Sequence, residues 1–160
     1  MYWKRMDTNQ TYQVHLSILL KPIWVNTPPT IRIGINDKIA EATLDNETWF
    51  DYRYTSAATT DKLHIEFYGK TDADTDIINN KDTAVIIDQI KFNGITSPKF
   101  AWAGVYIPNY PIHYIKDNPT AASTLSPATY MGWNGVWTLE FTIPVFTWIH
   151  KIEGLGWIYD

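Results

Sequence analysis

Apolar and polar side chains alternate along most of the chain, and this pattern predicts β-strands. Between residues 12 and 20, every second side chain is apolar, while Gln13, His15 and Ser17 lie between them. Successive side chains of a strand point to opposite faces, so such a segment buries one face and leaves the other in water. We expect seven further strands from similar segments: 30–35, 38–44, 47–55, 61–69, 83–94, 100–107 and 135–143.

Breaks between these segments are typical of turns, and the end of the chain changes to helical spacing. Asn36-Asp37 and Asn93-Gly94 favour tight turns between neighbouring strands. After Pro144, apolar residues recur every three or four positions up to Gly154, which predicts one short C-terminal helix. The stretch from about 107 to 131 contains four prolines and shows no periodicity. We expect a long surface loop there, and such loops are often functional.

These elements predict one all-β domain that covers residues 1–160. The expected fold is an antiparallel β-sandwich of jelly-roll type, with the short C-terminal helix closing one end. The composition agrees, because 45% of the residues are hydrophobic and 15% are aromatic, enough for a substantial core.

Charge and composition exclude several classes of partner. The net charge of −4, without a basic cluster, disfavours nucleic acid as a partner. No apolar stretch approaches the roughly 20 residues that span a bilayer, and the first ten residues lack the apolar core of a signal peptide. The absence of cysteine excludes disulfides and thiolate metal sites. We therefore expect a protein made in the cytoplasm without cleavage and without a membrane partner.

A cluster of carboxylates between two expected strands suggests a cation site. The candidate ligands are Asp72, Asp74, Asp76 and Asp82. The spacing begins like an EF-hand loop, but Ile77 stands where that loop needs glycine and Thr83 where it needs glutamate. Two alternatives are left: an irregular calcium site made of loop oxygens, or a solvated acidic connection.

Aromatic residues with polar neighbours form the second candidate site. The residues expected to contact a ligand are Trp49, Arg53, Tyr106, Tyr110, Tyr114, Tyr130 and Trp133. Ring faces pack against flat apolar surfaces while hydroxyl and N–H groups meet polar ones, which suits a sugar or a protein partner. The alternative is that the long loop folds back and buries its own rings.

Catalytic motifs give no support for an enzyme. The four histidines lack metal-ligand spacing, and no G-x-S-x-G elbow or glycine-rich phosphate loop occurs. A Ser-His-Asp group or a carboxylate pair for glycoside hydrolysis could be assembled, but no residues are singled out for either. We expect no catalytic residues.

The region from Thr11 to Gly94 resembles the calcium-dependent, xylan-binding type of carbohydrate-binding module, which is a jelly-roll sandwich. The resemblance is carried by IRIGIND (31–37), KLHIEFYGK (62–70) and KDTAVIIDQIKFNG (81–94). It implies that Asp82 is a calcium ligand, helped by Asp72, Asp74 or Asp76. The family's Asp-Arg-Asn-Leu is replaced here by Asp82 to Val85, with Thr and Ala between them.

The C-terminal half is similar instead to small proteins of tailed bacteriophages, in particular marine, T4-like phages. FAWAGVYIPNYP (100–111) and the segment 130–160 carry this likeness. It implies a virion component, such as a tail, fibre or capsid accessory protein, that works without catalysis and binds other virion proteins or a surface glycan. A symmetric assembly or homo-oligomer is then expected. The alternatives are a calcium-dependent carbohydrate-binding module and, with less support, a glycan hydrolase.

Overall fold

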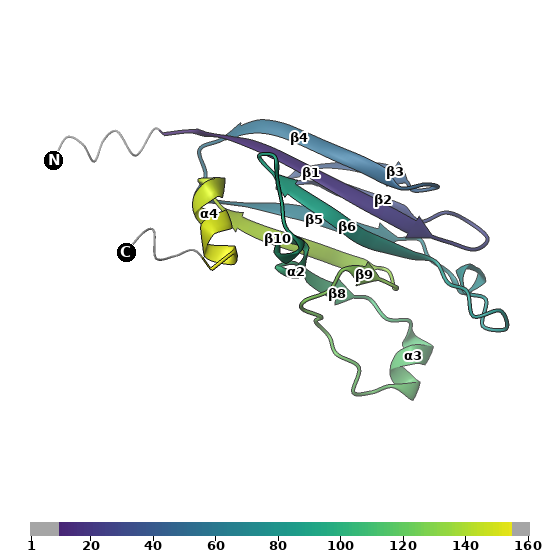
Figure 1. Cartoon of the computed structure of the whole chain (residues 1–160). Coiled ribbons are helices and arrows are strands. Elements are labelled where there is room, and N and C mark those ends of the chain that lie inside the picture. The colour runs from purple at the N-terminus through teal and green to yellow at the C-terminus, as the bar shows by residue number, and fades with distance from the viewer. Residues whose placement is uncertain (1–9, 155–160) are drawn as a thin grey trace.

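Two five-stranded antiparallel sheets pack face to face in the computed structural model, which describes residues 10–154 (Figure 1). The first sheet has the order β4-β1-β6-β7, and β9 also pairs with β6. The second has the order β3-β2-β5-β10-β8. The strands are β1 (Tyr12–Ile23), β2 (Thr30–Ile35), β3 (Lys38–Thr43), β4 (Thr48–Ser56), β5 (Thr60–Tyr68), β6 (Ala84–Phe92), β7 (Ile95–Thr96), β8 (Val105–Pro108), β9 (Tyr130–Met131) and β10 (Gly135–Thr142). The predicted all-β sandwich is confirmed.

The alternation predicted which side chains face the core. In β1, Val14, Leu16 and Ile18 are buried between the sheets, while His15 and Ser17 lie on the outer face. The two sheets thereby bury their apolar faces against each other, which is the main stabilising contribution in a sandwich of this kind.

The expected strand at 100–107 is wrong in its first half. Residues Pro98–Trp102 form helix α2, and only Val105–Pro108 is a strand, β8. The helix starts because the Ser97 hydroxyl accepts a hydrogen bond from the Lys99 amide at 3.3 Å and Pro98 fixes the backbone of the first turn. Phe100 points inward, where it packs edge-on against Phe92 with ring centroids 5.4 Å apart.

Helix α4 (Val145–Ile152) closes one end of the sandwich, as predicted from its spacing. Figure 1 shows it at the end where β1 begins. The ring of Trp148 lies 5.1 Å from that of Phe92, which is also 4.8 Å from Phe141. Aromatic pairs at these distances add to the stability gained by burying them.

The long connection from 107 to 131 contains one short helix, α3 (Ile112–Asp117), none of whose residues is fully buried. Figure 1 shows α3 well away from both sheets, beyond β8 and β9. A further 3-10 turn, η1 (Asp72–Asp74), lies in the connection between β5 and β6 at the end of the sandwich opposite α4. No helix between residues 10 and 154 is long and apolar enough to cross a membrane.

Candidate ligand-binding site

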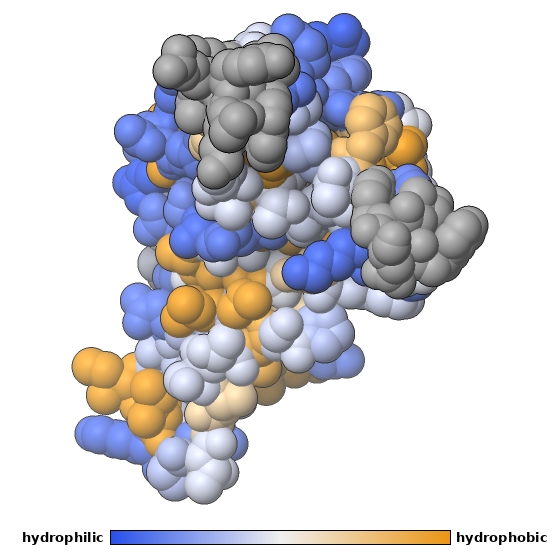
Figure 2. Space-filling model, turned by 90° about the vertical axis from the view of Figure 1, so that its left-hand side faces the viewer, coloured by the Kyte–Doolittle hydropathy of each residue, from blue (hydrophilic) through white to orange (hydrophobic). Residues whose placement is uncertain are grey.

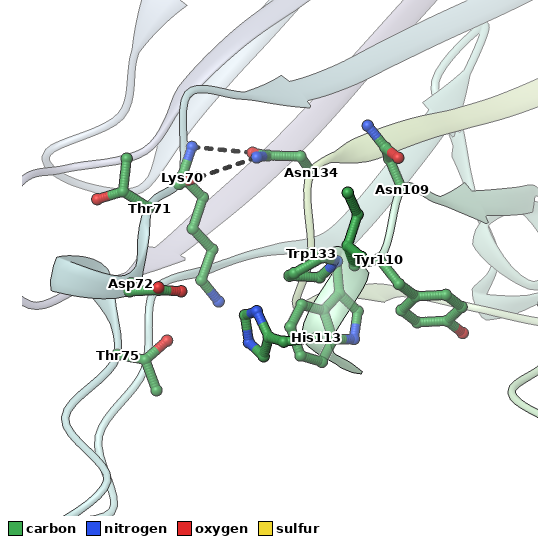
Figure 3. A pocket seen from close by; sticks show the side chains of 11 residues that line it. Lys70, Thr71, Asp72, Thr75, Asn109, Tyr110, His113, Trp133 and Asn134 are labelled. Atoms are coloured by element: carbon green, nitrogen blue, oxygen red, sulfur yellow. Dashed lines mark hydrogen bonds between the residues drawn. The ribbon is translucent and has the colours of Figure 1, made fainter. Parts of the chain in front are cut away.

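An open cavity of about 510 Å³ lies between the connection after β5 and the segment before α3 (Figure 3). Side chains from segments 70–75 and 109–113 form two of its sides, and Trp133 and Asn134 complete the lining. Figure 3 shows Lys70 and Asp72 on one side, facing His113 and Trp133 on the other. Its volume is within the range of sites that hold small molecules.

Asn134 joins the strand ends that carry the two sides of the cavity. Its side-chain oxygen accepts a hydrogen bond from the Lys70 amide at 2.9 Å, and its side-chain nitrogen donates to the Lys70 carbonyl at 3.0 Å (Figure 3). The Asn134 carbonyl accepts a further bond from the Asn109 amide at 2.6 Å. Because Lys70 follows β5, Asn109 follows β8 and Asn134 precedes β10, these bonds fix the cavity to three neighbouring strands of one sheet.

Three of the predicted aromatic residues come together beside the cavity. Tyr110 stacks on Tyr114 with centroids 5.1 Å apart, and Trp133 lies 4.7 Å from Tyr114 and 5.7 Å from Tyr110. All three rings are half-buried. The rings therefore pack on one another, yet Tyr110 and Trp133 also line an open cavity, and their contact with a ligand stays a prediction.

Tyr106 is not a surface residue, which corrects its prediction as a ligand contact. Only 1% of it is exposed, because β8 pairs with β10 and turns its side chain toward the core beside Trp137. Its hydroxyl donates a hydrogen bond to the Trp133 carbonyl and accepts one from the Trp133 amide at 3.1 Å. Burial raises the pKa of this hydroxyl. Tyr106 therefore positions Trp133 from the inside.

Asp82 forms an ion pair with the side chain of Lys70. Lys70 Nζ lies 2.6 Å from Asp82 Oδ1 and 2.6 Å from the Gly132 carbonyl oxygen. The same carboxylate oxygen accepts hydrogen bonds from the Thr75 hydroxyl and the Thr83 amide, both at 2.8 Å. Lys70 Nζ also lies 5.5 Å from the centre of the Trp133 ring, and the Lys70 side chain is 6% exposed.

The other three predicted metal ligands point in different directions. The 3-10 turn at 72–74 replaces the extended chain in which alternate side chains would share one side. Asp74 turns inward; burial opposes its charge, but hydrogen bonds from the Thr71 amide and the Thr27 hydroxyl lower its pKa. The Asp76 carboxylate accepts hydrogen bonds from the side chain and the backbone amide of Asn79, and these bonds lower the pKa of Asp76. Asp72 lines the cavity.

Calcium, implied by the family resemblance, does not fit these residues. Within residues 10–154, no three acidic, histidine or cysteine side chains converge on a point that could hold a metal. Calcium needs six to eight oxygen ligands, whereas Asp82 faces the Lys70 ammonium, Asp74 accepts hydrogen bonds from Thr71 and Thr27, and Asp76 accepts them from Asn79. The expected calcium site is therefore corrected to an ion pair.

The remaining predicted contact residues lie outside the cavity. Trp49 and Arg53 are exposed on β4, at the edge of the first sheet, where Lys91 Nζ lies 4.9 Å from the centre of the Trp49 ring. Tyr130 is exposed on β9, opposite Ile86 of β6. None of the three lines the cavity beside Trp133.

One Ser-His-Asp group does form, on the outer face of the first sheet, but its geometry is not that of a catalytic triad. His15 Nε2 lies 2.7 Å from Asp51 Oδ1 and 3.3 Å from the Ser17 hydroxyl. The Ser17 hydroxyl itself donates to Asp51 Oδ1 at 2.5 Å. In a triad, the histidine uses different nitrogens for serine and aspartate. Here the same nitrogen, Nε2 of His15, faces both Ser17 and Asp51. His15 therefore cannot accept a proton from Ser17 on one nitrogen while Asp51 orients the other.

Several cavity residues were missed by the sequence reasoning: Lys70, Asn109, His113 and Asn134. A signal existed for two of them, since Lys70 follows a strand-ending glycine and Asn134 precedes another glycine at the start of β10. No local pattern marks Asn109 or His113, because their place depends on how the long connection folds.

No protein-family model matches the chain, and no curated protein matches its sequence. Two solved structures are similar in shape. One is vCBM60 in complex with galactobiose, with 14% identity over 78% of this chain and 96% of that chain and a TM-score of 0.47. The other is the selenomethionine form of vCBM60, from work linking two families of calcium-dependent carbohydrate-binding modules by circular permutation. It has 13% identity over 79% of this chain and 89% of that chain and a TM-score of 0.49.

Proposed function

We propose that this protein is a non-catalytic binding domain that holds part of a carbohydrate chain in the cavity beside Trp133. The observation that carries the proposal is the position of the Trp133 ring, which lines an open cavity among polar side chains. A pyranose ring has apolar C–H faces and a rim of hydroxyls, so it suits an aromatic ring surrounded by donors and acceptors.

Polar groups of the cavity are available to such a ligand. Among residues 10–154, no internal hydrogen bond engages the side chains of Asp72, Asn109 or His113, which line the cavity. A carboxylate accepts hydrogen bonds, an amide does both, and a neutral imidazole has one donor and one acceptor. Sugar hydroxyls can satisfy all three, whereas a purely apolar ligand would leave them unpaired.

Rigid support is the second requirement for a binding site, and the cavity has it. The backbone of Trp133 is hydrogen-bonded to the buried Tyr106 hydroxyl, and its ring packs against the ring of Tyr114. The side chain of Asn134 is fixed by two hydrogen bonds to the backbone of Lys70. A site whose groups are already in place loses less entropy when a ligand binds.

The test is glycan binding by the wild-type protein and two tryptophan variants. A glycan array first identifies a ligand, and titration calorimetry then measures its affinity. We expect Trp133→Ala to weaken binding by about tenfold or more. Trp102→Ala is the matched control, because Trp102 is exposed on α2 and does not line the cavity. Circular dichroism establishes that both variants fold.

Two results would overturn the proposal. One is the absence of binding to any neutral or acidic glycan on the array. The other is unchanged affinity in Trp133→Ala, which would move the ligand elsewhere on the protein.

A second candidate is a structural role in a bacteriophage virion, where the protein would bind copies of itself or other virion proteins. The exposed apolar residues at the tip of the β5–β6 connection favour it, since Ile77 is 87% exposed and Ile78 is 94% exposed. Ile112 on α3 is also exposed, and Figure 2 shows hydrophobic surface near the lower end of the molecule, where Figure 1 places α3. Large exposed apolar side chains that are neighbours, such as Ile77 and Ile78, favour protein contacts.

Light scattering tests this second role. An assembly role predicts a defined oligomer at micromolar concentration that dissociates in Ile77→Ser/Ile78→Ser, while the variant keeps the melting temperature of the wild type. A monomer at all concentrations tested would count against self-association. The virion itself stays a prediction from the likeness of the C-terminal half to phage proteins.

A further inference from the structure

We infer that the Lys70 ammonium is a built-in cation that holds together the chain segments beside the cavity, so that this site works without a metal ion. The ammonium lies 2.6 Å from both Asp82 Oδ1 and the Gly132 carbonyl oxygen. Carboxylate and carbonyl oxygens are also the ligands that calcium prefers. Lys70 therefore satisfies the kind of oxygen atoms that would otherwise recruit a cation.

Both ends of the β5–β6 connection and the turn between β9 and β10 meet at this one group. Lys70 follows β5, Asp82 precedes β6, and Gly132 lies between β9 and β10. The contact to Gly132 spans 62 positions of the chain. An ammonium donates three hydrogen bonds, and two of them are used here to connect these segments.

The surroundings keep the ion pair strong and exclude a second cation. The Lys70 side chain is 6% exposed and the Asp82 side chain 37% exposed, so the pair is shielded from water mainly on the Lys70 side, which strengthens the attraction between the two charges. A calcium ion at the same oxygens would meet the positive charge of Lys70 at close range. The carboxylates of Asp74 and Asp76 are engaged in other hydrogen bonds, and Asp72, which also lines the cavity, is not part of a group of three such ligands within residues 10–154.

The same ammonium also faces the ligand that we propose above. Lys70 lines the cavity, its Nζ lies 5.5 Å from the centre of the Trp133 ring, and its third N–H is left for a sugar oxygen. This part of the inference rests on the proposed function. It predicts that glycan affinity is the same in calcium and in a chelator.

The decisive measurement is thermal unfolding, which needs no glycan and so separates this inference from the proposed function. We expect the wild-type melting temperature to change by less than about 1 °C between excess calcium and excess EDTA, because within residues 10–154 no three acidic, histidine or cysteine side chains converge to hold the ion. Lys70→Met keeps most of the side-chain volume but removes the charge. We expect it to lower the melting temperature by about 4 to 8 °C.

Lys62→Met is the matched control, because Lys62 forms a more exposed and longer ion pair, 3.9 Å from Glu140. Its loss should shift the melting temperature by about 1 °C or less. Calorimetric titration of the wild type with calcium alone should give no binding heat. A calcium stoichiometry of one per chain, a rise of several degrees with calcium, or equal melting temperatures for Lys70→Met and Lys62→Met would overturn the inference.

Discussion

The buried hydroxyl of Tyr106 is hydrogen-bonded to both backbone groups of Trp133, donating to its carbonyl and accepting from its amide at 3.1 Å. The two residues lie 27 positions apart, on either side of the long connection. Tyr106 belongs to the core of the sandwich, while the ring of Trp133 lines the cavity. The position of the candidate site is therefore set directly by the packed interior.

Tyr106→Phe is expected to lower the free energy of unfolding by about 1 to 3 kcal/mol. The substitution keeps the ring but leaves the amide and carbonyl of Trp133 without their partner in a part-buried place. Urea unfolding followed by circular dichroism measures the loss. Glycan affinity should fall as well, since the backbone that carries Trp133 is no longer held.

Tyr110→Phe is the matched control for this effect. Its hydroxyl donates to the Ala122 carbonyl at 2.8 Å, but this bond is exposed, so water can replace it. We expect a loss of about 0.5 kcal/mol or less. Equal stabilities of the two variants would show that the Tyr106 hydroxyl does not support Trp133.

Sequence periodicity predicted the sandwich well because its signal is local. In β1, the alternation of Leu16 and Ile18 with Ser17 is visible within a few residues, and it fixes which face is buried. The helix α2 was missed although Ser97-Pro98 is a recognised start signal, because the apolar residues after it were read with period two.

The candidate site was predicted only in part because its contacts are long-range. Tyr110, Tyr114 and Trp133 could be named from their chemistry, but the inward turn of Tyr106 depends on the pairing of β8 with β10. The pairing of Lys70 with Asp82 depends likewise on how the intervening loop folds. The alternating aspartates were misleading because that loop begins with a 3-10 turn instead of an extended chain.

A buried carboxylate gives a second stability prediction. Asp61 is 3% exposed and accepts hydrogen bonds from the Tyr54 hydroxyl at 2.8 Å and the Asn36 side chain at 3.1 Å. Burial, together with the nearby carboxylate, raises the pKa of the Tyr54 hydroxyl. Tyr54→Phe should cost about 1.5 to 3 kcal/mol, the range for a hydrogen bond to a charged group.

Tyr52→Phe provides the comparison, because Tyr52 lies two residues earlier on the same face of β4. Only burial raises the pKa of its hydroxyl, so no carboxylate depends on it. Chemical denaturation should show a loss of less than about 1 kcal/mol for this variant. If Tyr54→Phe were no worse than Tyr52→Phe, the bond to Asp61 would not contribute to stability.

Gly104 marks a place where the core allows no side chain. A Cβ atom at this position would lie 1.9 Å from Cζ2 of Trp137, which is fully buried and donates to the Ala128 carbonyl at 2.8 Å. Gly104→Ala should therefore destabilise the protein by about 3 kcal/mol, since a packed indole cannot move freely. Thermal unfolding would report the change.

Gly94→Ala separates crowding from backbone strain. Gly94 has a φ of 84°, which an alanine tolerates poorly, but no atom lies within 4 Å of its added Cβ. The expected loss is about 1 kcal/mol from the left-handed backbone alone. If Gly104→Ala lowers the free energy of unfolding by no more than Gly94→Ala does, the side chains around Trp137 can rearrange to accommodate the added methyl group.

The group of His15, Ser17 and Asp51 predicts a specific titration. A hydrogen bond from the Ser17 hydroxyl, followed by one from His15, lowers the pKa of Asp51 from 3.8 to about 2. Because the pKa of Asp51 is lower in the folded than in the unfolded protein, the ionised Asp51 carboxylate stabilises the fold fully above about pH 4. This contribution is lost as the pH falls through about 2.

The pKa of Asp51 can be measured directly from its carboxyl carbon shift by NMR between pH 1 and 6. We expect Ser17→Ala to raise it partway toward 3.8, and Arg53→Ala, whose contribution is smaller, to raise it less. A wild-type Asp51 that titrates near 4, or equal shifts in the two variants, would contradict this assignment.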